Sequence, residues 1–290
     1  MLKRNAFQHL IHWKNKKNRK PLVIRGARQV GKSSLVRLFA ESADLELLEI
    51  NLELSDDYID CFTAKDPGLI IPLLELKAGR KILPGKTLLF LDEIQSAPKI
   101  LATLRYFYEL MPGLHVVAAG SLLEFVLEEH TFSMPVGRIE YLHLGPMTFK
   151  EFLAGIDREQ LVSFIEQFHH TDDLPPVLHN ELMKLFKMYC AVGGMPEAVQ
   201  VFQESGSMFE ADAVKQAILL TYRDDFSKYG RRVNRTLLQN VFQSLPLQVG
   251  QKLKYVNLDR NEKSAEVKKT LHLLALAREK QKLDSAREPN

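Results

Sequence analysis

The stretch Gly26-Ala-Arg-Gln-Val-Gly31-Lys32-Ser33 fits the pattern G-x-x-x-x-G-K-[ST] with no mismatch. An apolar segment at 21–25, expected as a buried strand, precedes it, and helical spacing over 33–41 follows it. Glycines let the backbone curl so that successive N–H groups point inward around an anion, and the helix N-terminus adds a favourable dipole. With a strand before it and a helix after it, the stretch predicts a phosphate-binding loop rather than a chance glycine-rich turn.

Two residues of this loop have predicted chemical roles. The Lys32 ammonium would reach the β- and γ-phosphates of a nucleoside triphosphate, and the Ser33 hydroxyl would ligate Mg²⁺. The predicted nucleotide-binding set comprises Gly26, Ala27, Arg28, Gln29, Val30, Gly31, Lys32, Ser33 and Ser34.

A second motif, Leu88-Leu-Phe-Leu91-Asp92-Glu93, places two carboxylates at the end of a continuous apolar run. Such a run is typical of a strand covered on both faces, and open α/β sheets bind ligands at the carboxyl ends of their strands. Asp92 is therefore predicted to hold the Mg²⁺ shell, and Glu93 to polarise a water for attack on the γ-phosphate. The alternative is an acidic cap for the next helix, and it loses weight because the two motifs predict each other.

The adjacent acidic pair also narrows the class of protein. A general base directly after a metal-binding Asp suits a hydrolase. The sequence has no Asn-Lys-x-Asp motif of the kind with which GTP-binding proteins read their base. A small-molecule kinase would not need Glu93 at this point.

Two further catalytic residues are predicted. Ser121 follows the apolar run 116–120, and it would orient the attacking water if that strand lies between the loop strand and the Asp92 strand; a helix N-cap role has equal weight. Arg138 is the candidate for an arginine that compensates transition-state charge, a role worth ~10³–10⁵-fold in turnover, with a solvated Arg before a strand as the alternative. Arg28 and Arg105 are weaker candidates for the same role.

Apolar periodicity divides the chain into an α/β part and a helical part. Strands alternate with helices up to residue 144, which implies right-handed crossovers and a parallel sheet with helices on both sides. Residues 148–245 show helical periodicity and no convincing strand, so a domain boundary is expected near 146–150. The expected strands are 21–25, 45–52, 87–91, 115–119 and 138–144, and the expected helices of this part are 4–13, 33–41, two within 55–78, and 98–110.

Composition sets wider limits. With 290 residues, of which 46% are apolar, the chain is long enough for two domains with their own cores. The net charge of +3 does not argue for nucleic acid by itself. No signal peptide and no apolar stretch of membrane-spanning length is visible, so a cytoplasmic protein without membrane insertion is expected. A basic run before the first sheet strand leaves open a solvated loop or an anionic partner; it comprises Lys14, Lys16, Lys17, Arg19 and Lys20.

Six motifs together resemble one family, the prokaryotic AAA-type predicted ATPases with a C-terminal domain of unknown function. The resemblance covers residues 4–275, and the combination is specific although only the first two motifs are specific alone. In chain order the motifs are Gly26-Ala-Arg-Gln-Val-Gly-Lys-Ser, Leu91-Asp-Glu-Ile-Gln95, Ala119-Gly-Ser121, Gly137-Arg138, Pro146-Met-Thr-Phe-x-Glu-Phe152 and Gly193-Gly-Met-Pro196-Glu197.

The resemblance implies a P-loop NTPase core over residues 1–147, with a parallel five-stranded sheet of order 5-1-4-3-2, followed by an all-helical lid over residues 148–235. It implies ATP and Mg²⁺ as cofactors, bound by residues 26–34, Asp92 and Glu93 in the roles given above. The segment Gly193 to Pro196 would be a lid element near the base of the nucleotide, or a turn between two lid helices.

In the same family a winged-helix module follows the lid, and residues 236–277 resemble its helical part. Its last helix, which carries Lys268 and Lys269, would be a recognition helix if the module binds duplex DNA. A packing or protein–protein surface is the alternative. Relatives continue well past this point, so the β-wing is expected to be missing and the chain to be truncated, with residues 278–290 as a disordered tail.

The expected function is therefore Mg²⁺-dependent ATP hydrolysis coupled to lid movement, with Lys32, Glu93, Ser121 and Arg138 as the catalytic set. The alternative is a nucleotide-gated DNA-binding or protein-binding regulator with little or no turnover. Assembly into a homo-oligomer stays open, because ring formation, common among AAA proteins, is not written in the sequence.

Overall fold

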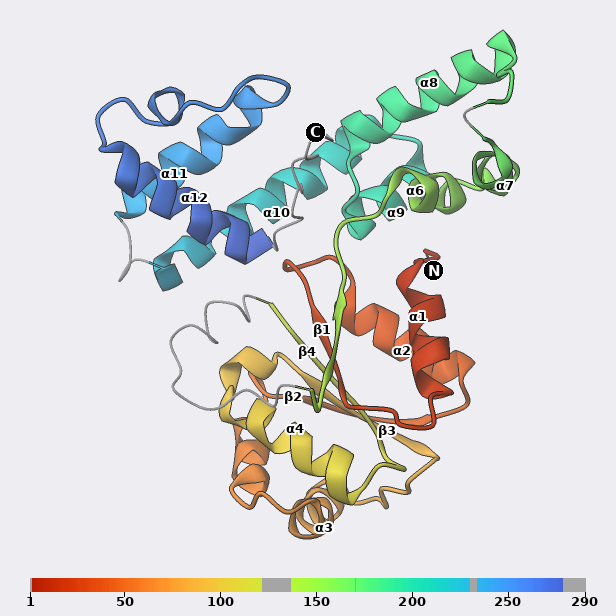
Figure 1. The fold of residues 1–290 in the computed structure, drawn as a ribbon, viewed down its shortest axis with the longest axis vertical. Coiled ribbons are helices and arrows are strands. Elements are labelled where there is room, and N and C mark those ends of the chain that lie inside the picture. The colour runs from red at the N-terminus through yellow and green to blue at the C-terminus, as the bar shows by residue number, and fades with distance from the viewer. Residues whose placement is uncertain (1, 122–136, 170, 230–233, 279–290) are drawn as a thin grey trace, which may run out of the picture. The chain divides into compact units, whose positions relative to one another are not determined.

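The computed structural model describes residues 2–121, 137–169, 171–229 and 234–278 (Figure 1). The chain divides into two compact units, Met1–Lys215 and Gln216–Asn290. The finer boundaries expected at 147/148 and 235/236 stay predictions. Apart from Arg278, the expected tail 278–290 lies outside the described residues.

A sheet of five strands forms the centre of the first unit. The strand order is β2-β3-β4-β1-β5, and all four neighbouring pairs are parallel. This confirms the expected order 5-1-4-3-2, read from the opposite edge. The strands are β1 (Leu22–Arg25), β2 (Glu46–Asn51), β3 (Thr87–Asp92), β4 (His115–Gly120) and β5 (Glu140–His143).

Helices cover both faces of this sheet. Successive residues of a strand point to opposite faces, so each strand contributes to both layers of the core. In β3, Leu88 and Phe90 belong to the core under α1 (Ala6–Lys14) and α2 (Lys32–Ser42). The other face packs against η1 (Asp56–Phe62), α3 (Pro67–Ala78) and α4 (Lys99–Leu110) through Leu89 and Leu91. All six β3 residues are buried, which explains the continuous apolar run before Asp92.

The basic run before β1 has structural partners. Lys14 Nζ donates to the Ala43 carbonyl at 2.8 Å, and Lys16 Nζ pairs with Glu140 Oε2 at 2.6 Å. Arg19 donates to the backbone carbonyls of residues 14, 112 and 113. These bonds fasten the segment to the edge of the sheet where strands begin, so much of its positive charge is used within the fold.

Past Leu144 the described chain up to residue 245 is helical, as the periodicity predicts. A core that includes Met147, Phe152, Val192, Val199 and Ala211 packs four of these helices together, while the helix at 159–167 contributes no buried residue to it. They are α6 (Phe149–Gly155), α7 (Glu159–Gln167), α8 (Pro176–Val192), α9 (Pro196–Ser205) and α10 (Met208–Tyr229), which continues into the second unit.

The second unit is also helical where it is described. It contains α11 (Arg235–Ser244), two short 3-10 helices, η3 (Leu245–Gln248) and η4 (Tyr255–Asn257), and α12 (Ser264–Arg278). The Asn234 side chain caps α11 by accepting a hydrogen bond from the Thr236 N–H at 2.9 Å. The buried apolar residues of the second unit include Leu237, Leu238, Val241, Val267, Leu273 and Leu274. Across the described ranges, none of the helices has the length and apolar content needed to cross a membrane.

Candidate functional site

The loop between β1 and α2 turns tightly where the sequence predicts a phosphate cradle. Gln29 and Gly31 have φ angles of 62° and 87°, so the backbone enters the left-handed region twice. A Cβ on Gly26 would lie only 2.1 Å from the Leu144 carbonyl oxygen, so glycine is required where the chain after β5 passes. A backbone curled in this way can direct successive N–H groups toward one anion.

Lys32 is held inside this loop. Its side chain is buried, and Nζ donates to the carbonyls of Gly26 at 2.9 Å and Ala27 at 2.8 Å. A positive charge at the first position of α2 opposes the helix dipole, which favours negative charge at that end. The ammonium and the dipole together therefore make this point strongly attractive to an anion.

The two sequence motifs meet in one hydrogen bond. Ser33 Oγ, in the first turn of α2, donates to Asp92 Oδ2 at 2.6 Å, although 59 residues separate them. Asp92 ends β3 and is buried, and its Oδ1 accepts from the Glu93 N–H at 3.0 Å. A hydroxyl beside a carboxylate is the hard oxygen donor set that Mg²⁺ prefers, so the residues present fit this ion.

Electrostatics at Asp92 point the same way. Burial raises the pKa of Asp92 above its ordinary value, and the nearby Glu93 charge adds to the rise, while the hydrogen bonds from Ser33 and from the Glu93 backbone oppose it. The ionised carboxylate is thus disfavoured in the fold, and a cation at this point would offset that cost.

Glu93 occupies an unusual backbone position. Its φ of 53° and ψ of 45° are left-handed, which is uncommon for a residue other than glycine and is concentrated at functional sites. Its carboxylate accepts a hydrogen bond from Gln95 Nε2. Gln95 Oε1 is buried and lacks a hydrogen-bond partner among the described residues. The sequence assigned no role to Gln95 beyond its place in a family motif, yet it holds the predicted base.

Ser121 lies at the same edge of the sheet. Strand β4 lies between β1 and β3, as the prediction required, and Gly120 pairs with Arg25, directly before the loop. The Ser121 Oγ is buried with no partner in the described part of the chain. An unpartnered buried hydroxyl costs about 1–3 kcal/mol, so this atom fits a role toward a bound group. The helix that an N-cap role requires would fall on residues outside the described ranges.

Arg138 is not brought to this cluster. Glu140 pairs with Leu22 at the start of β1, so Arg138 lies toward the amino ends of the strands. There its Nε donates to Glu109 Oε1 at 3.0 Å. Because the phosphate loop follows the carboxyl end of β1, the expectation that Arg138 compensates charge at the loop of its own chain is corrected. Of the weaker candidates, Arg28 lies within the loop, while the Arg105 guanidinium lies over the Tyr106 ring.

A residue that the sequence did not single out contacts the loop from outside. Arg4 Nη1 donates to the Val30 carbonyl at 2.8 Å. Its only sequence signal is a positive charge just before the first turn of a helix, where the dipole disfavours it.

Comparison with known proteins agrees with this geometry. Residues 18–153 match the model of the AAA domain family, a range that includes the loop, Asp92, Glu93 and Ser121. This part of the chain is therefore similar in sequence to AAA domains. Beyond it, residues 183–290 match a domain of unknown function, DUF8612. None of the curated proteins matches the chain in sequence.

Among solved structures, the chain is similar to the Walker-type ATPase PABY2304 of Pyrococcus abyssi, with a TM-score of 0.56 and 14% identity over 96% of this chain and 90% of that one. Two more are a RuvB variant of Thermotoga maritima, with a TM-score of 0.45 and 13% identity over 95% and 87% of the two chains, and Drosophila ORC bound to DNA, with 0.42 and 14% over 93% and 79%. At this identity the first likeness shows the fold alone.

Asp92→Asn is expected to stabilise the nucleotide-free protein while weakening its response to Mg²⁺. Since the pKa of Asp92 is raised by folding, the ionised group destabilises the fold above that pKa, and this cost disappears as the pH falls below the unfolded-state pKa. The variant should therefore melt at a higher temperature than the wild type at pH 7. Calorimetry checks this.

Two controls belong to this experiment. The difference in melting temperature should shrink as the pH is lowered toward about 4, the ordinary pKa of Asp. Asp60→Asn, at an exposed position in η1, should leave the melting temperature nearly unchanged. A variant Asp92→Asn that melts below the wild type at pH 7 would contradict this reading of the site.

Proposed function

We propose that this protein binds ATP with Mg²⁺ and hydrolyses the β–γ phosphoanhydride, coupling the reaction to movement of a helical lid. The observation that carries the proposal is the 2.6 Å hydrogen bond between Ser33 Oγ and Asp92 Oδ2. It unites the phosphate loop and the acidic end of β3 in one site, which is the arrangement that a nucleotide–metal complex requires.

Binding falls to the loop. The backbone N–H groups of residues 26–34 and the Lys32 ammonium hold the phosphates, while Ser33 and Asp92 hold the ion. When bound, Mg²⁺ neutralises the charge that develops on the phosphate oxygens. The adenine base and the ribose lie outside this set of contacts, and preference for ATP over GTP is part of the proposal.

Hydrolysis falls to the neighbouring side chains. Glu93 accepts the proton of the water that attacks the γ-phosphorus, and its hydrogen bond from Gln95 sets the direction of the carboxylate. The Ser121 hydroxyl, at the end of the strand between β1 and β3, orients that water. The Lys32 ammonium stabilises the negative charge on the γ-phosphate oxygens in the transition state.

The helical segment after residue 147 forms the lid that moves. Met147 N–H donates to the Gly194 carbonyl at 2.6 Å, and the Tyr189 hydroxyl donates to the Met147 carbonyl at 2.8 Å. Pro196 lies close to the loop, with its Cγ 3.6 Å from the position of a Cβ on Gly31. A shift of the loop would thus reach α8 and α9 directly, which supports a lid within residues 148–235.

Glu93→Gln is expected to bind ATP but to release phosphate about 10²–10⁴-fold more slowly than the wild type, because the amide cannot accept the proton. The measurement is phosphate release with ATP and with GTP, alongside retention of radiolabelled ATP on a filter. Glu46→Gln, an exposed glutamate at the start of β2, is the control and should turn over normally. Hydrolysis by Glu93→Gln at the wild-type rate would show that Glu93 is not the base.

A second candidate function is a nucleotide-gated regulator that binds duplex DNA through the second unit. In α12, Val267 and Leu274 are buried in that unit, whereas Lys268 and Lys269 are exposed. Two adjacent exposed lysines on one helix fit contacts to backbone phosphates, and the same face fits an acidic protein partner.

If this candidate is correct, a gel-shift titration with duplex DNA at 50 mM and 200 mM salt will show affinity that falls with salt and changes on adding ATP. Replacing Lys268 and Lys269 by alanine should lower the salt slope by about two phosphate contacts. The matched control replaces Lys184 and Lys187, which are exposed on α8. No binding to duplex DNA at low salt would remove this candidate.

A further inference from the structure

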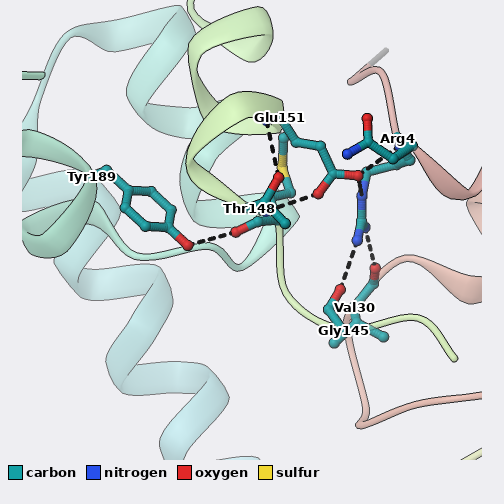
Figure 2. A network of polar contacts seen from close by, with 8 residues as sticks. Arg4, Val30, Gly145, Thr148, Glu151 and Tyr189 are labelled. Carbon is teal, nitrogen blue, oxygen red and sulfur yellow. Dashed lines mark hydrogen bonds and ion pairs between the residues drawn. The ribbon is translucent and has the colours of Figure 1, made fainter. Parts of the chain in front are cut away.

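Arg4 connects the phosphate loop to the start of α6 (Figure 2). Each of its three guanidinium nitrogens donates to a different acceptor. Nη1 donates to the Val30 carbonyl at 2.8 Å, Nη2 to the Gly145 carbonyl at 2.6 Å, and Nε to Glu151 Oε1 at 3.2 Å. The side chains of Arg4 and Glu151 are 8% and 6% exposed, so the ion pair is buried.

The bond to Val30 fixes the orientation of one peptide group of the loop. In a planar trans peptide the carbonyl of one residue and the N–H of the next point in opposite directions. A donor that holds the Val30 carbonyl therefore keeps the Gly31 N–H pointing away from Arg4. Arg4 also lies beside Gly31, since its Nη1 is 3.8 Å from the position that a Cβ on Gly31 would take.

The bond to Glu151 fixes the first turn of α6. Glu151 Oε1 also accepts from the Asn5 N–H at 2.7 Å, and Oε2 accepts from the Thr148 N–H at 2.8 Å. The Thr148 hydroxyl in turn accepts from the Glu151 N–H at 3.3 Å, which completes a capping box. The Glu151 carboxylate is thus shared between Arg4 and the N-terminus of the helix (Figure 2).

Stability alone is a poor reason for this arrangement. Burying two charges costs several kcal/mol per ion before their attraction is counted, and apolar pairs of similar size often stabilise a fold as well or better. What the guanidinium adds is direction, since its rigid fork can hold three acceptors in fixed positions at once.

We infer that Arg4 is a positioning residue of the phosphate loop, which aims the Gly31 N–H at the bound phosphate and links that peptide to the first turn of α6 through Glu151. The inference rests on the proposed nucleotide binding. It adds that occupancy of the loop is communicated to the helical segment along the path from Val30 through Arg4 and Glu151 to Thr148.

The test begins with Arg4→Lys, which keeps the positive charge beside Glu151 but has one nitrogen in place of three. Titration calorimetry with ADP and Mg²⁺ should show affinity reduced roughly three- to ten-fold, the range expected for loss of one well-aligned hydrogen bond. Arg19→Lys is the matched control, because Arg19 also donates to backbone carbonyls, but near the amino ends of the strands, away from the phosphate loop. Arg19→Lys should bind ADP with wild-type affinity, even if its melting temperature falls as far as that of Arg4→Lys.

Glu151→Gln and the double variant test the link. Glu151 makes no contact with the loop itself in the hydrogen bonds described, yet its replacement should also weaken ADP binding, because Arg4 loses the acceptor that orients it. The double variant should bind no more than about two-fold more weakly than the weaker single variant, since both act on the same bond. Fully additive losses would show that the two residues act separately and would overturn the link.

Hydrogen exchange of the wild type tests the path without any substitution. Adding ADP and Mg²⁺ should slow amide exchange in peptides that cover 26–34 and also at Asn5 and Thr148, whose N–H groups bond to Glu151. Protection confined to the loop would overturn the inference, as would wild-type ADP affinity in Arg4→Lys. Failure of the wild type to bind ADP at all would instead refute the proposed function on which the inference rests.

Discussion

The contact between Ser33 Oγ and Asp92 Oδ2 is the interaction on which the site depends. Neighbouring strands lie about 4.8 Å apart, so β1 and β3, with β4 between them, are separated by roughly 10 Å. The phosphate loop at the end of β1 bridges that gap because α2 begins directly after it and carries Ser33 across. A parallel sheet places all the strand ends at the same edge, so Ser121 at the end of β4 lies between the two motifs.

The loop is held from two sides, and the two sides differ in chemistry. On the inner side, Lys32 and Asp92 are buried charged groups whose natural counterparts are a phosphate and a cation. The pKa of Asp92 is raised because its carboxylate is buried. On the outer side, Arg4 and Glu151 satisfy one another and the backbone around them. The outer network is complete within the protein, which lets it fix the loop's shape, whereas the inner groups are suited to a ligand.

Much of the fold and the centre of the site could be predicted because they depend on local sequence. The curl of residues 26–31 needs glycine at specific backbone angles, and a strand buried on both faces needs the unbroken apolar run before Asp92. The strand order followed from the family resemblance and is confirmed. The roles of Arg4 and Gln95 could not be predicted from the sequence, because they arise from contacts made only after folding. Arg138 precedes β5, as its sequence position suggests, but its distance from the loop follows only from the parallel pairing of β5 with β1, which places it toward the amino ends of the strands.

The most direct test is a crystal structure of the protein grown with ADP and Mg²⁺. The account predicts a diphosphate inside the turn formed by residues 26–33, with the metal about 2.0–2.1 Å from Ser33 Oγ and Asp92 within its coordination or hydration shell. A nucleotide bound at another place, or a metal that avoids both Ser33 and Asp92, would contradict it.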